Sequence, residues 1–427
     1  MTAGHPSTQP RLVKEADALA EAGYRVRVVA TKLVAWADTA DREFEDRPWS
    51  DVAWARIGPF AAWPQRQAMR LRRRLLRPLA WRAPQLSPRL ATLAFHDAVP
   101  QLIRHAIAEP ADLYIAHNLA ALAAAHRAAE VHGARLGFDA EDFHRGELEQ
   151  SRANRRQIRL TAALENFYIP RCDYVTAGSD GIALAYARAL AIDPPVTILN
   201  AFPLADRHRP TAAECIARER QGPELSLYWF SQTIGPHRGL EGALQAMARL
   251  GPAIRLHVRG TWATGYQEWF MAEAKRLGLG GRVHHLPPVP PGELIARSSR
   301  HDVGLALESG DRINSNLMTT NKILTYFVAG LAIAATDTEG QRTVMARAPG
   351  AGLCYPRGDV AALAAWLEQL IAAPTRLEAA RRAALAAAQE RFCWEKQKLV
   401  FTHLIADIMA RAPRLGRPAT RTGAMHR

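Results

Sequence analysis

The segment NKILTYFVAGLAIAATDTEGQ (321–341) decides the fold of this chain. Its apolar residues follow a helical spacing up to Gly330, a typical helix end, and an apolar strand then runs to Thr336. A helix followed by an almost continuous apolar strand predicts a parallel sheet that is covered on both faces. The start of such a helix suits phosphate oxygens, to which Lys322 and Asn321 would add a cation and an amide. A buried unit whose polar residues only cap the helix is the alternative interpretation.

The same alternation of helices and strands fills the chain in two series of similar size. The first series ends at Phe202, and the polar stretch that follows lacks strand character. The pattern restarts at LSLYWFS (225–231) and closes with a long helical stretch. The sequence therefore predicts an N-terminal domain, a linker, a C-terminal domain, a closing helix and a basic tail, over residues 1–202, 203–222, 223–395, 396–412 and 413–427.

Polar residues fall at the expected carboxyl ends of the strands, where ligands bind in such sheets. These residues are His117, Glu141, Ser179, Asn200, Ser231, Gly260, Glu308 and Asp337. A doubly wound domain normally opens with a strand, but TAGHPSTQPRL (2–12) has the character of the loop after that strand. We therefore expect the first strand to be missing or the start to be assigned too late. The central position of the sheet would then be empty or taken by another segment.

A second candidate for phosphate binding is FSQTIGPHRGLEGAL (230–244). Its strand ends at Ser231, and a loop with Gly and Pro then carries Arg238 to the start of a helix. A basic side chain beside a helix N-terminus is suited to phosphate. The segment GPHRG lacks the spacing of a P-loop or of GxGxxG, so an exposed turn with an incidental arginine is an equally good interpretation.

The net charge of +14 is concentrated in two places. Nine arginines and no acidic residue lie between Asp51 and Asp97, and five more arginines follow Asp407. No apolar run reaches the length of about 20 residues that spans a bilayer, and no signal peptide is recognisable, so we expect a cytoplasmic protein. The four cysteines show no metal spacing. No recognition module accompanies the basic charge, which argues against nucleic acid as a partner.

Residues 59–82 (PFAAWPQRQAMRLRRRLLRPLAWR) predict a cationic amphipathic helix. One face would carry Arg66, Arg70, Arg73, Arg74 and Arg77, and another Leu71, Leu75 and Leu79. Such helices bind anionic lipid surfaces, which would make this a peripheral protein on the inner face of the cell membrane. A solvated helix packed on its own domain is the alternative.

Five segments together carry a resemblance to a known family. In chain order they are residues 5–30, 282–307, 321–337, 352–367 and 390–396. The chain resembles retaining GT-B glycosyltransferases of the large family 4-like, group 1 type, which includes sucrose synthases and bacterial polysaccharide-assembly enzymes. The resemblance implies an α/β protein with two Rossmann-like, doubly wound parallel-sheet domains that face each other across a cleft. It also implies that the second domain holds the donor nucleotide.

The resemblance implies a set of donor-binding residues. Arg238 matches the basic residue that contacts the donor diphosphate, and Thr325 stands where the family has a glutamate for the ribose hydroxyls. The other glutamate of the family would fall at Leu317, so Glu308 or Asn316 would substitute for it. The donor site is thus expected to contain Ser231, Arg238, Glu308, Asn316, Asn321, Lys322 and Thr325.

On the acceptor side, His117 and Glu141 are the candidate catalytic residues, because a carboxylate and a histidine can deprotonate a hydroxyl. Glu141 and Asp142 would otherwise cap the helix that follows. In retaining enzymes of this fold the donor phosphate helps the acceptor proton to leave. The fold also implies no metal and no cofactor.

These observations predict a hexosyltransferase of polysaccharide biosynthesis. It would move a sugar from a nucleotide diphosphate sugar to a hydroxyl of a glycan or lipid-linked acceptor, with retention. Two alternatives remain open: a GT-B-like protein that binds a nucleotide sugar or glycan without turnover, and a sugar-nucleotide epimerase.

Overall fold

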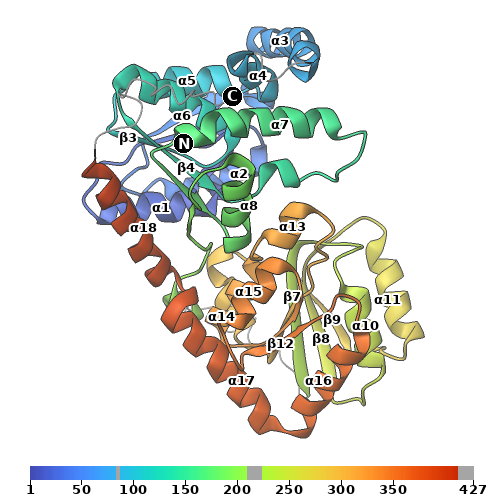
Figure 1. The fold of residues 1–427 in the computed structure, drawn as a ribbon. Coiled ribbons are helices and arrows are strands. Elements are labelled where there is room, and N and C mark those ends of the chain that lie inside the picture. The colour runs from blue at the N-terminus through green and yellow to red at the C-terminus, as the bar shows by residue number, and fades with distance from the viewer. Residues whose placement is uncertain (83–86, 209–223, 412–427) are drawn as a thin grey trace, which may run out of the picture. The chain divides into compact units, whose positions relative to one another are not determined.

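The computed structural model describes residues 1–82, 87–208 and 224–411, which divide into two compact units (Figure 1). The first unit comprises Met1–Gly178, Ile182–Ile198 and the described residues from Lys398 on, and the second comprises Ser179–Gly181 and Leu199–Gln397. The chain passes between units at 198/199, near the predicted boundary at 202. Residues 209–222 of the predicted linker and the predicted basic tail lie outside the described residues.

The second unit is built on a six-stranded parallel sheet. Its strands are β7 (Leu225–Ile234), β8 (Ile254–Trp262), β9 (Val283–Leu286), β10 (Val303–Ala306), β11 (Ala332–Thr336) and β12 (Gly352–Tyr355). Their order across the sheet is β12-β11-β10-β7-β8-β9. Numbered from β7, this is the strand order 3-2-1-4-5-6 of a Rossmann sheet. The order in which the chain adds strands therefore reverses between β7 and β10, where Val303 pairs with Leu227.

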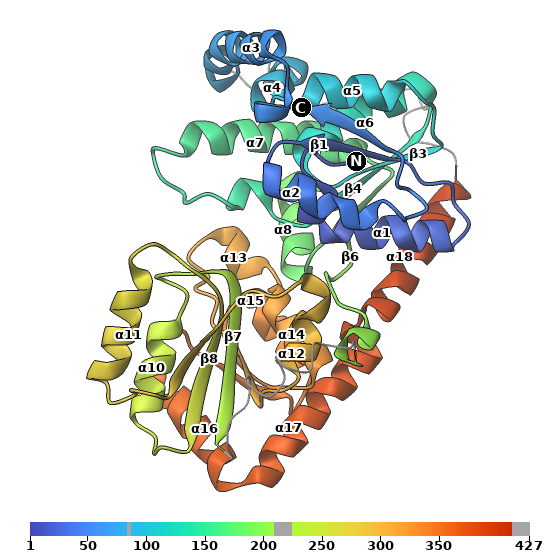
Figure 2. The ribbon, with the colours of Figure 1, turned by 180° about the vertical axis from the view of Figure 1, so that it is seen from behind.

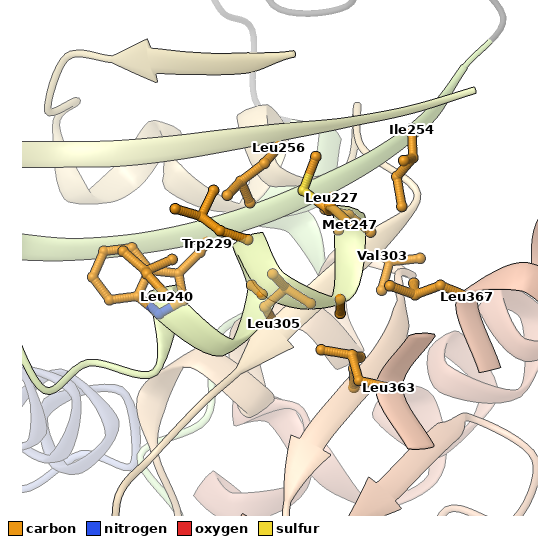
Figure 3. Packing of buried hydrophobic residues seen from close by; sticks show 14 of the residues in the cluster. Leu227, Trp229, Leu240, Met247, Ile254, Leu256, Val303, Leu305, Leu363 and Leu367 are labelled. Atoms are coloured by element: carbon orange, nitrogen blue, oxygen red, sulfur yellow. The ribbon is translucent and has the colours of Figure 1, made fainter. Parts of the chain in front are cut away.

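Helices cover both faces of this sheet. They are α10 (Leu240–Ala248), α11 (Tyr266–Arg276), α12 (Leu294–Ser298), α13 (Ile313–Leu317), α14 (Asn321–Ala329), α15 (Glu339–Ala346), α16 (Val360–Ala372) and α17 (Pro374–Ala387). Side chains of α10, α11 and α16 pack on one face, and those of α12, α14 and α15 on the other. Figure 3 shows the first of these layers, with Trp229 and Leu227 of β7 against Leu240 and Met247 of α10.

The alternation of side chains along the strands divides the core into these two layers. Leu227 and Trp229 belong to one cluster of buried residues, and Tyr228 between them belongs to the other. This is the period of two that a strand buried on both faces requires. The helix predicted before Gly330 is confirmed as α14, with Gly330 in the left-handed conformation at a φ of 70°.

The first unit contains two smaller parallel sheets. One pairs β1 (Val28–Lys32) with β2 (Val52–Arg56), and the other has the order β3-β4-β5-β6. These four strands are β3 (Leu113–Ala116), β4 (Arg135–Ala140), β5 (Tyr174–Ala177) and β6 (Val196–Thr197).

The position between β1 and β3, which the sequence predicts to be empty or substituted, is taken by residues 1–4. The backbone nitrogen of Met1 donates to Ile115 O at 2.7 Å, and His117 N donates to Met1 O at 3.0 Å. On the other side Thr2 N donates to Val29 O at 2.9 Å. This short segment therefore connects the two sheets. The combined order from β2 to β5 repeats the order of the second unit, and β6 adds one more strand at the edge.

Nine helices of the first unit surround these sheets in the described residues. They are α1 (Pro10–Glu21), α2 (Ala35–Ala40), α3 (Trp63–Arg82), α4 (Pro88–Phe95), α5 (Val99–Ile107), α6 (Leu119–His132), α7 (Arg155–Tyr168), α8 (Asp180–Leu190), whose first two residues belong to the second unit, and α18 (Trp394–Met409), which joins the first unit from Lys398 on. Local signals fix their ends, as in α6, where the Asn118 side chain accepts from Ala121 N and Gly133 terminates the helix.

The end of α18 is tied to β4 by Arg135. The Arg135 guanidinium donates to Ile408 O at 3.0 Å and to Met409 O at 2.9 Å, which satisfies carbonyls that a helix end leaves unpaired. Lys398 pairs with Glu21 of α1 at 2.6 Å. These contacts explain why the predicted closing helix belongs to the first unit. Among the described residues, no helix combines the length and apolar character that crossing a bilayer requires.

Candidate functional site

A pocket of about 310 Å³ lies at the carboxyl ends of the strands in the second unit. Its walls come from the loops after β7, β10 and β12, the end of β11, and the first turns of α10 and α16. It is therefore at the point where the strand order reverses, between β7 and β10. Open α/β sheets bind ligands at this position, because the loops diverge there and leave a crevice.

The crevice depends on Gly239, the residue before α10. Gly239 has a φ of +79°, and a Cβ placed on it would lie 2.6 Å from Leu307 Cβ and 2.8 Å from Leu307 O. Leu307 follows β10, so this glycine allows the two loops at the reversal point to touch. Gly239 is also the N-cap of α10 and has no side chain with which to cap the helix. The N–H groups in the first turn of α10 therefore have no side-chain cap, and this end of the helix is suited to binding an anion.

Arg238 stands next to this end and is exposed. Its position after β7 and before α10 is the one that the sequence predicts for a diphosphate contact. Ser231, also predicted to bind the donor, lies in β7 and is partly buried. The predicted strand end at Ser231 is wrong, because β7 continues to Ile234. The register of β7 against β8 shifts between Phe230 and Thr233, so Ser231 lies at an irregularity, after which pairing with β8 resumes.

Glu308, Thr320 and Lys322 form a polar group at the start of α14. Lys322 Nζ lies 2.7 Å from Glu308 Oε1, and the Thr320 hydroxyl donates to the same oxygen at 3.0 Å. Burial alone would raise the pKa of Glu308, but the charge and hydrogen bond of Lys322 hold it below its ordinary value. The Lys322 ammonium also lies 5.5 Å from the centre of the Trp229 ring. The two predicted donor residues Glu308 and Lys322 are therefore brought together, as partners of each other.

Asn316 and Asn321, the two predicted amides, each have a structural partner. Asn316 Oδ1 accepts from Glu339 N at 3.2 Å, at the first residue of α15. Asn321 Oδ1 accepts from the Asn200 amide at 3.2 Å. Their donor-binding roles stay predictions.

Thr325 requires a correction to its expected role. It lies inside α14 with no exposed surface, and its hydroxyl has no hydrogen-bond partner among the described residues. A ribose hydroxyl cannot reach this side chain in the present conformation.

One ion pair borders the pocket at its exposed side. The Arg357 guanidinium contacts both the Asp311 carboxylate and Ser309 O. Asp311 and Arg357 side chains are 59% and 54% exposed, so solvent screens this pair. The pair links the loops after β10 and β12 across the pocket mouth.

The reversal point of the first unit contains a different arrangement, a buried cluster of four charged or titratable side chains. We refer to Arg11, Glu15, His117 and Asp139 as the buried charge cluster. Arg11 Nε donates to Asp139 Oδ2 at 2.7 Å, and a second guanidinium nitrogen contacts the other oxygen. His117 Nδ1 lies 3.2 Å from Asp139, and His117 Nε2 lies 3.5 Å from Glu15. Thr176 Oγ1 donates to Asp139 at 2.8 Å.

Burial sets the charge states in this cluster. Burial alone would raise the pKa of Asp139, but the Arg11 guanidinium holds it well below its usual range. Burial and the charge of Asp139 raise the pKa of Glu15 well above its ordinary value. Burial also lowers the pKa of His117, despite its hydrogen bond to Asp139. Arg11 and Asp139 thus form an ion pair, whereas burial disfavours the charged forms of Glu15 and His117.

The cluster also has the composition of a metal site, since ligand atoms of Glu15, His117 and Asp139 all lie within 4.8 Å of one another. However, Arg11 covers both oxygens of Asp139. A cation would have to enter beside this guanidinium, against its charge. The residues therefore fit an internally paired network better than a metal ion.

The two predicted catalytic residues, His117 and Glu141, differ in their exposure to solvent. His117 is 6% exposed, and its two ring nitrogens face the buried carboxylates of Asp139 and Glu15. Its role as a base at an acceptor stays a prediction. Glu141, which follows β4, is partly exposed. Burial raises the pKa of Glu141 to about 7. Burial and the Arg11 charge lower the pKa of Lys14 to about 7. Both groups therefore change their charge near neutral pH.

Sequence reasoning missed Arg11, Glu15 and Asp139. Arg11 and Glu15 are four residues apart, so they share one face of α1, and Asp139 lies inside an apolar strand. The sequence offered one signal for this cluster: charged residues on the buried face of a helix and within a buried strand. Buried charges must be paired, so such residues are expected to contact one another.

Comparison with solved structures supports the architecture. The chain is similar to HepE from Anabaena, solved in complex with UDP, at 16% identity and a TM-score of 0.66, over 95% of this chain and 98% of that one. It is similar to sucrose-phosphate synthase from Thermosynechococcus elongatus at 16% identity and a TM-score of 0.66, over 96% of each chain. A glycosyltransferase from Rickettsia africae matches at 11% identity and a TM-score of 0.63, over 96% and 97%.

No protein-family model and no curated protein matches the sequence. The identities to the solved structures are low, so these likenesses concern the fold. Together with the repeated Rossmann strand order, they confirm the predicted fold class, and the chain has the GT-B fold.

Proposed function

We propose that this protein is a glycosyltransferase that takes a hexose from a nucleoside diphosphate sugar and attaches it, with retention, to a hydroxyl of a glycan or lipid-linked acceptor in polysaccharide biosynthesis. The pocket at the β7/β10 reversal point carries this proposal, because the start of α10 lines it, together with His237 and Gly239, the two neighbours of exposed Arg238. Similar chains of the same fold have been solved with UDP and with UDP-glucose, which supports the class of donor.

The diphosphate is assigned to the start of α10 rather than to the start of α14. Thr320 caps α14, and the Glu308 carboxylate at that end would repel phosphate. Glycine at the N-cap of α10 leaves N–H groups for oxygens of the leaving diphosphate, and Arg238 adds a charge. Glu241 in the first turn of α10 is held by the Tyr266 hydroxyl at 2.6 Å. Positioning and charge stabilisation would then be the protein's main contributions to the rate.

In the proposed reaction the acceptor oxygen forms a bond to the anomeric carbon while the bond from that carbon to the diphosphate breaks. The acceptor proton passes to the leaving phosphate oxygen. This reaction requires no cofactor and no base from the protein.

The first experiment identifies the donor. Binding of UDP, GDP and TDP is measured by calorimetry, and hydrolysis of the corresponding radiolabelled sugar donors is followed without acceptor. We expect one base to bind and its sugar to be released slowly to water. Absence of binding for all three nucleotides would contradict the proposal.

The second experiment tests the diphosphate contact. Arg238→Ala should raise the dissociation constant of the selected nucleotide at least tenfold, which corresponds to about 1.4 kcal/mol. Arg249→Ala is the matched control, because Arg249 is an exposed arginine at the opposite end of the same helix. Equal affinities of the two variants would remove Arg238 from the site.

The second candidate function is nucleotide-sugar binding without turnover. The burial of Thr325 favours it, since the site lacks the carboxylate that the family places there. This candidate predicts nucleotide binding that Arg238→Ala weakens, but no sugar release and no transfer to any glycan acceptor. Interconversion of donors without acceptor would instead indicate an epimerase.

A further inference from the structure

The helix α3 exposes a stripe of leucines to solvent. Leu71, Leu75 and Leu79 are 58%, 57% and 54% exposed, and they follow one another at intervals of four residues. Trp63 at the start of the helix is 66% exposed. Side chains at this spacing lie on one face of a helix, so they form a continuous apolar strip. Figures 1 and 2 both show α3 at the periphery of its unit, next to α4.

The opposite face of α3 holds the helix on its unit. Ala80 is buried, and Met69 packs on the cluster of buried residues that includes Leu102. Arg72 donates to Asp97 O at 2.9 Å, and Arg73 pairs with the Asp97 carboxylate. Arg73, one of the five arginines predicted to face a membrane, is therefore engaged within its own unit. The helix is fixed in place with its leucines outward.

Basic side chains accompany the leucine stripe. Arg70 and Arg74 are exposed, and Arg77 is partly exposed, with its guanidinium 5.9 Å from the centre of the Trp81 ring. At 100° per residue these three arginines form a row beside the leucines. No acidic residue occurs from 52 to 96. The exposed surface of α3 is therefore apolar along one strip and positively charged beside it.

We propose that α3 is a membrane-docking helix that lies in the surface of an anionic bilayer, with Leu71, Leu75 and Leu79 among the lipid chains and Arg70, Arg74 and Arg77 at the phosphate groups. Helices of this composition bind at that depth, because the apolar strip leaves water while arginines meet lipid headgroups. A second copy of the chain fits this surface less well, since two such arginine rows would repel each other. The inference does not depend on the proposed transferase activity.

Co-sedimentation of the full chain with lipid vesicles tests the proposal. The protein is mixed with vesicles of phosphatidylcholine alone and with vesicles in which phosphatidylglycerol makes up a third of the lipid. We expect binding to the second kind only, and weaker binding at high salt. Equal binding to both kinds of vesicle would overturn the proposal, because arginine contacts with anionic headgroups would then have no role.

Two triple variants separate the contributions of the stripe and of the charges. Arg70→Gln, Arg74→Gln and Arg77→Gln together should weaken binding to anionic vesicles by about 100-fold. Leu71→Ser, Leu75→Ser and Leu79→Ser together should weaken it by at least tenfold. Both variants change exposed or partly exposed residues, and circular dichroism checks that they fold.

Each triple variant has a control in which three side chains of the same kind are replaced elsewhere in the chain. Arg188→Gln, Arg249→Gln and Arg382→Gln remove three positive charges from exposed positions elsewhere. Val131→Ser, Leu184→Ser and Leu399→Ser remove three exposed aliphatic side chains from other helices. Both controls should bind anionic vesicles like the parent protein. If the leucine variant binds as well as its control, or if it converts a dimer to a monomer in light scattering, the proposal is wrong.

Discussion

The two units place different chemistry at the same topological position. In the first unit, the reversal point beside β3 contains the buried charge cluster, whose members are at most 6% exposed and contact one another. In the second unit, the reversal point between β7 and β10 contains Gly239, a pocket and the exposed Arg238. Both occur where strand order reverses, so the fold alone does not decide which of them binds a ligand.

This difference distinguishes a charge that is compensated inside the protein from a charge that is available to a ligand. Asp139 accepts from Arg11, His117 and Thr176, so its charge is compensated inside the protein. Such a network fixes the packing of α1 against β4 and leaves little for a ligand. Arg238 is exposed at an uncapped helix start, and its charge is available to an anion. We therefore assign structural support to the first reversal point and donor binding to the second.

The largest predicted effect comes from breaking the cluster. Arg11→Met should lower the free energy of unfolding by about 3–5 kcal/mol, because it leaves the Asp139 carboxylate buried without its cation. Urea unfolding measures the change. Adding Asp139→Asn to this variant should recover part of the loss, since the uncompensated charge is then gone.

A surface ion pair is the control for this experiment. Arg47, 45% exposed, pairs with Asp17 at 2.9 Å, and Arg47→Met should cost less than about 1 kcal/mol. If Arg11→Met is as stable as Arg47→Met, the cluster is not the structural support that its burial indicates.

The next effect concerns Gly239 in the second unit. Gly239→Ala should cost about 2–4 kcal/mol of stability, because it combines left-handed strain with the close approach of Leu307. It should also abolish nucleotide binding by moving the start of α10. Gly265→Ala is the control, since Gly265 has a similar φ of +75° but no atom within 4 Å of its new Cβ. Equal costs for the two variants, by thermal unfolding, would show that the loops do not need to touch.

A smaller and pH-dependent effect is expected at Glu141. Burial raises its pKa from 4.5 to about 7, so ionisation opposes folding. This penalty is absent below about pH 4.5, grows as the pH rises to 7 and stays constant above. Glu141→Gln should therefore stabilise the protein by about 1–2 kcal/mol at pH 8 and by much less at pH 5. Glu149→Gln, at an exposed position nearby, is the control. A gain that does not depend on pH would contradict the raised pKa.

The fold could be predicted from sequence because its signals are local and repeated. Gly330 ends α14 as expected, and the apolar strand after it, β11, lies inside the sheet between β12 and β10. The use of residues 1–4 between β1 and β3 could not be predicted, since the hydrogen bonds of Met1 join it to Ile115 and His117, more than 100 residues away. The return of the chain to the first unit at Lys398 was missed for the same reason.

The site was predicted less completely than the fold. The sequence predicts the order of strand, loop and helix around Arg238, and this order places Arg238 between β7 and α10. Burial does not follow from that order, so His117 and Thr325 were assigned to ligands although the structure encloses both. The pairing of Lys322 with Glu308 also joins the start of α14 to the loop after β10, and sequence cannot place these two segments side by side.

The smallest predicted effect sharpens the distinction within the second unit itself. Glu308→Gln removes the partner of Lys322 and a negative charge near Arg238, so the selected nucleotide should bind about threefold more tightly, or about 0.6 kcal/mol. Asp311→Asn removes an exposed carboxylate from the same pocket and should change affinity less, because solvent screens that position. Calorimetry with both variants decides the role of Glu308. Weaker binding by Glu308→Gln would mean that this carboxylate contacts the nucleotide directly, as the sequence predicts, and that the start of α14 belongs to the donor site.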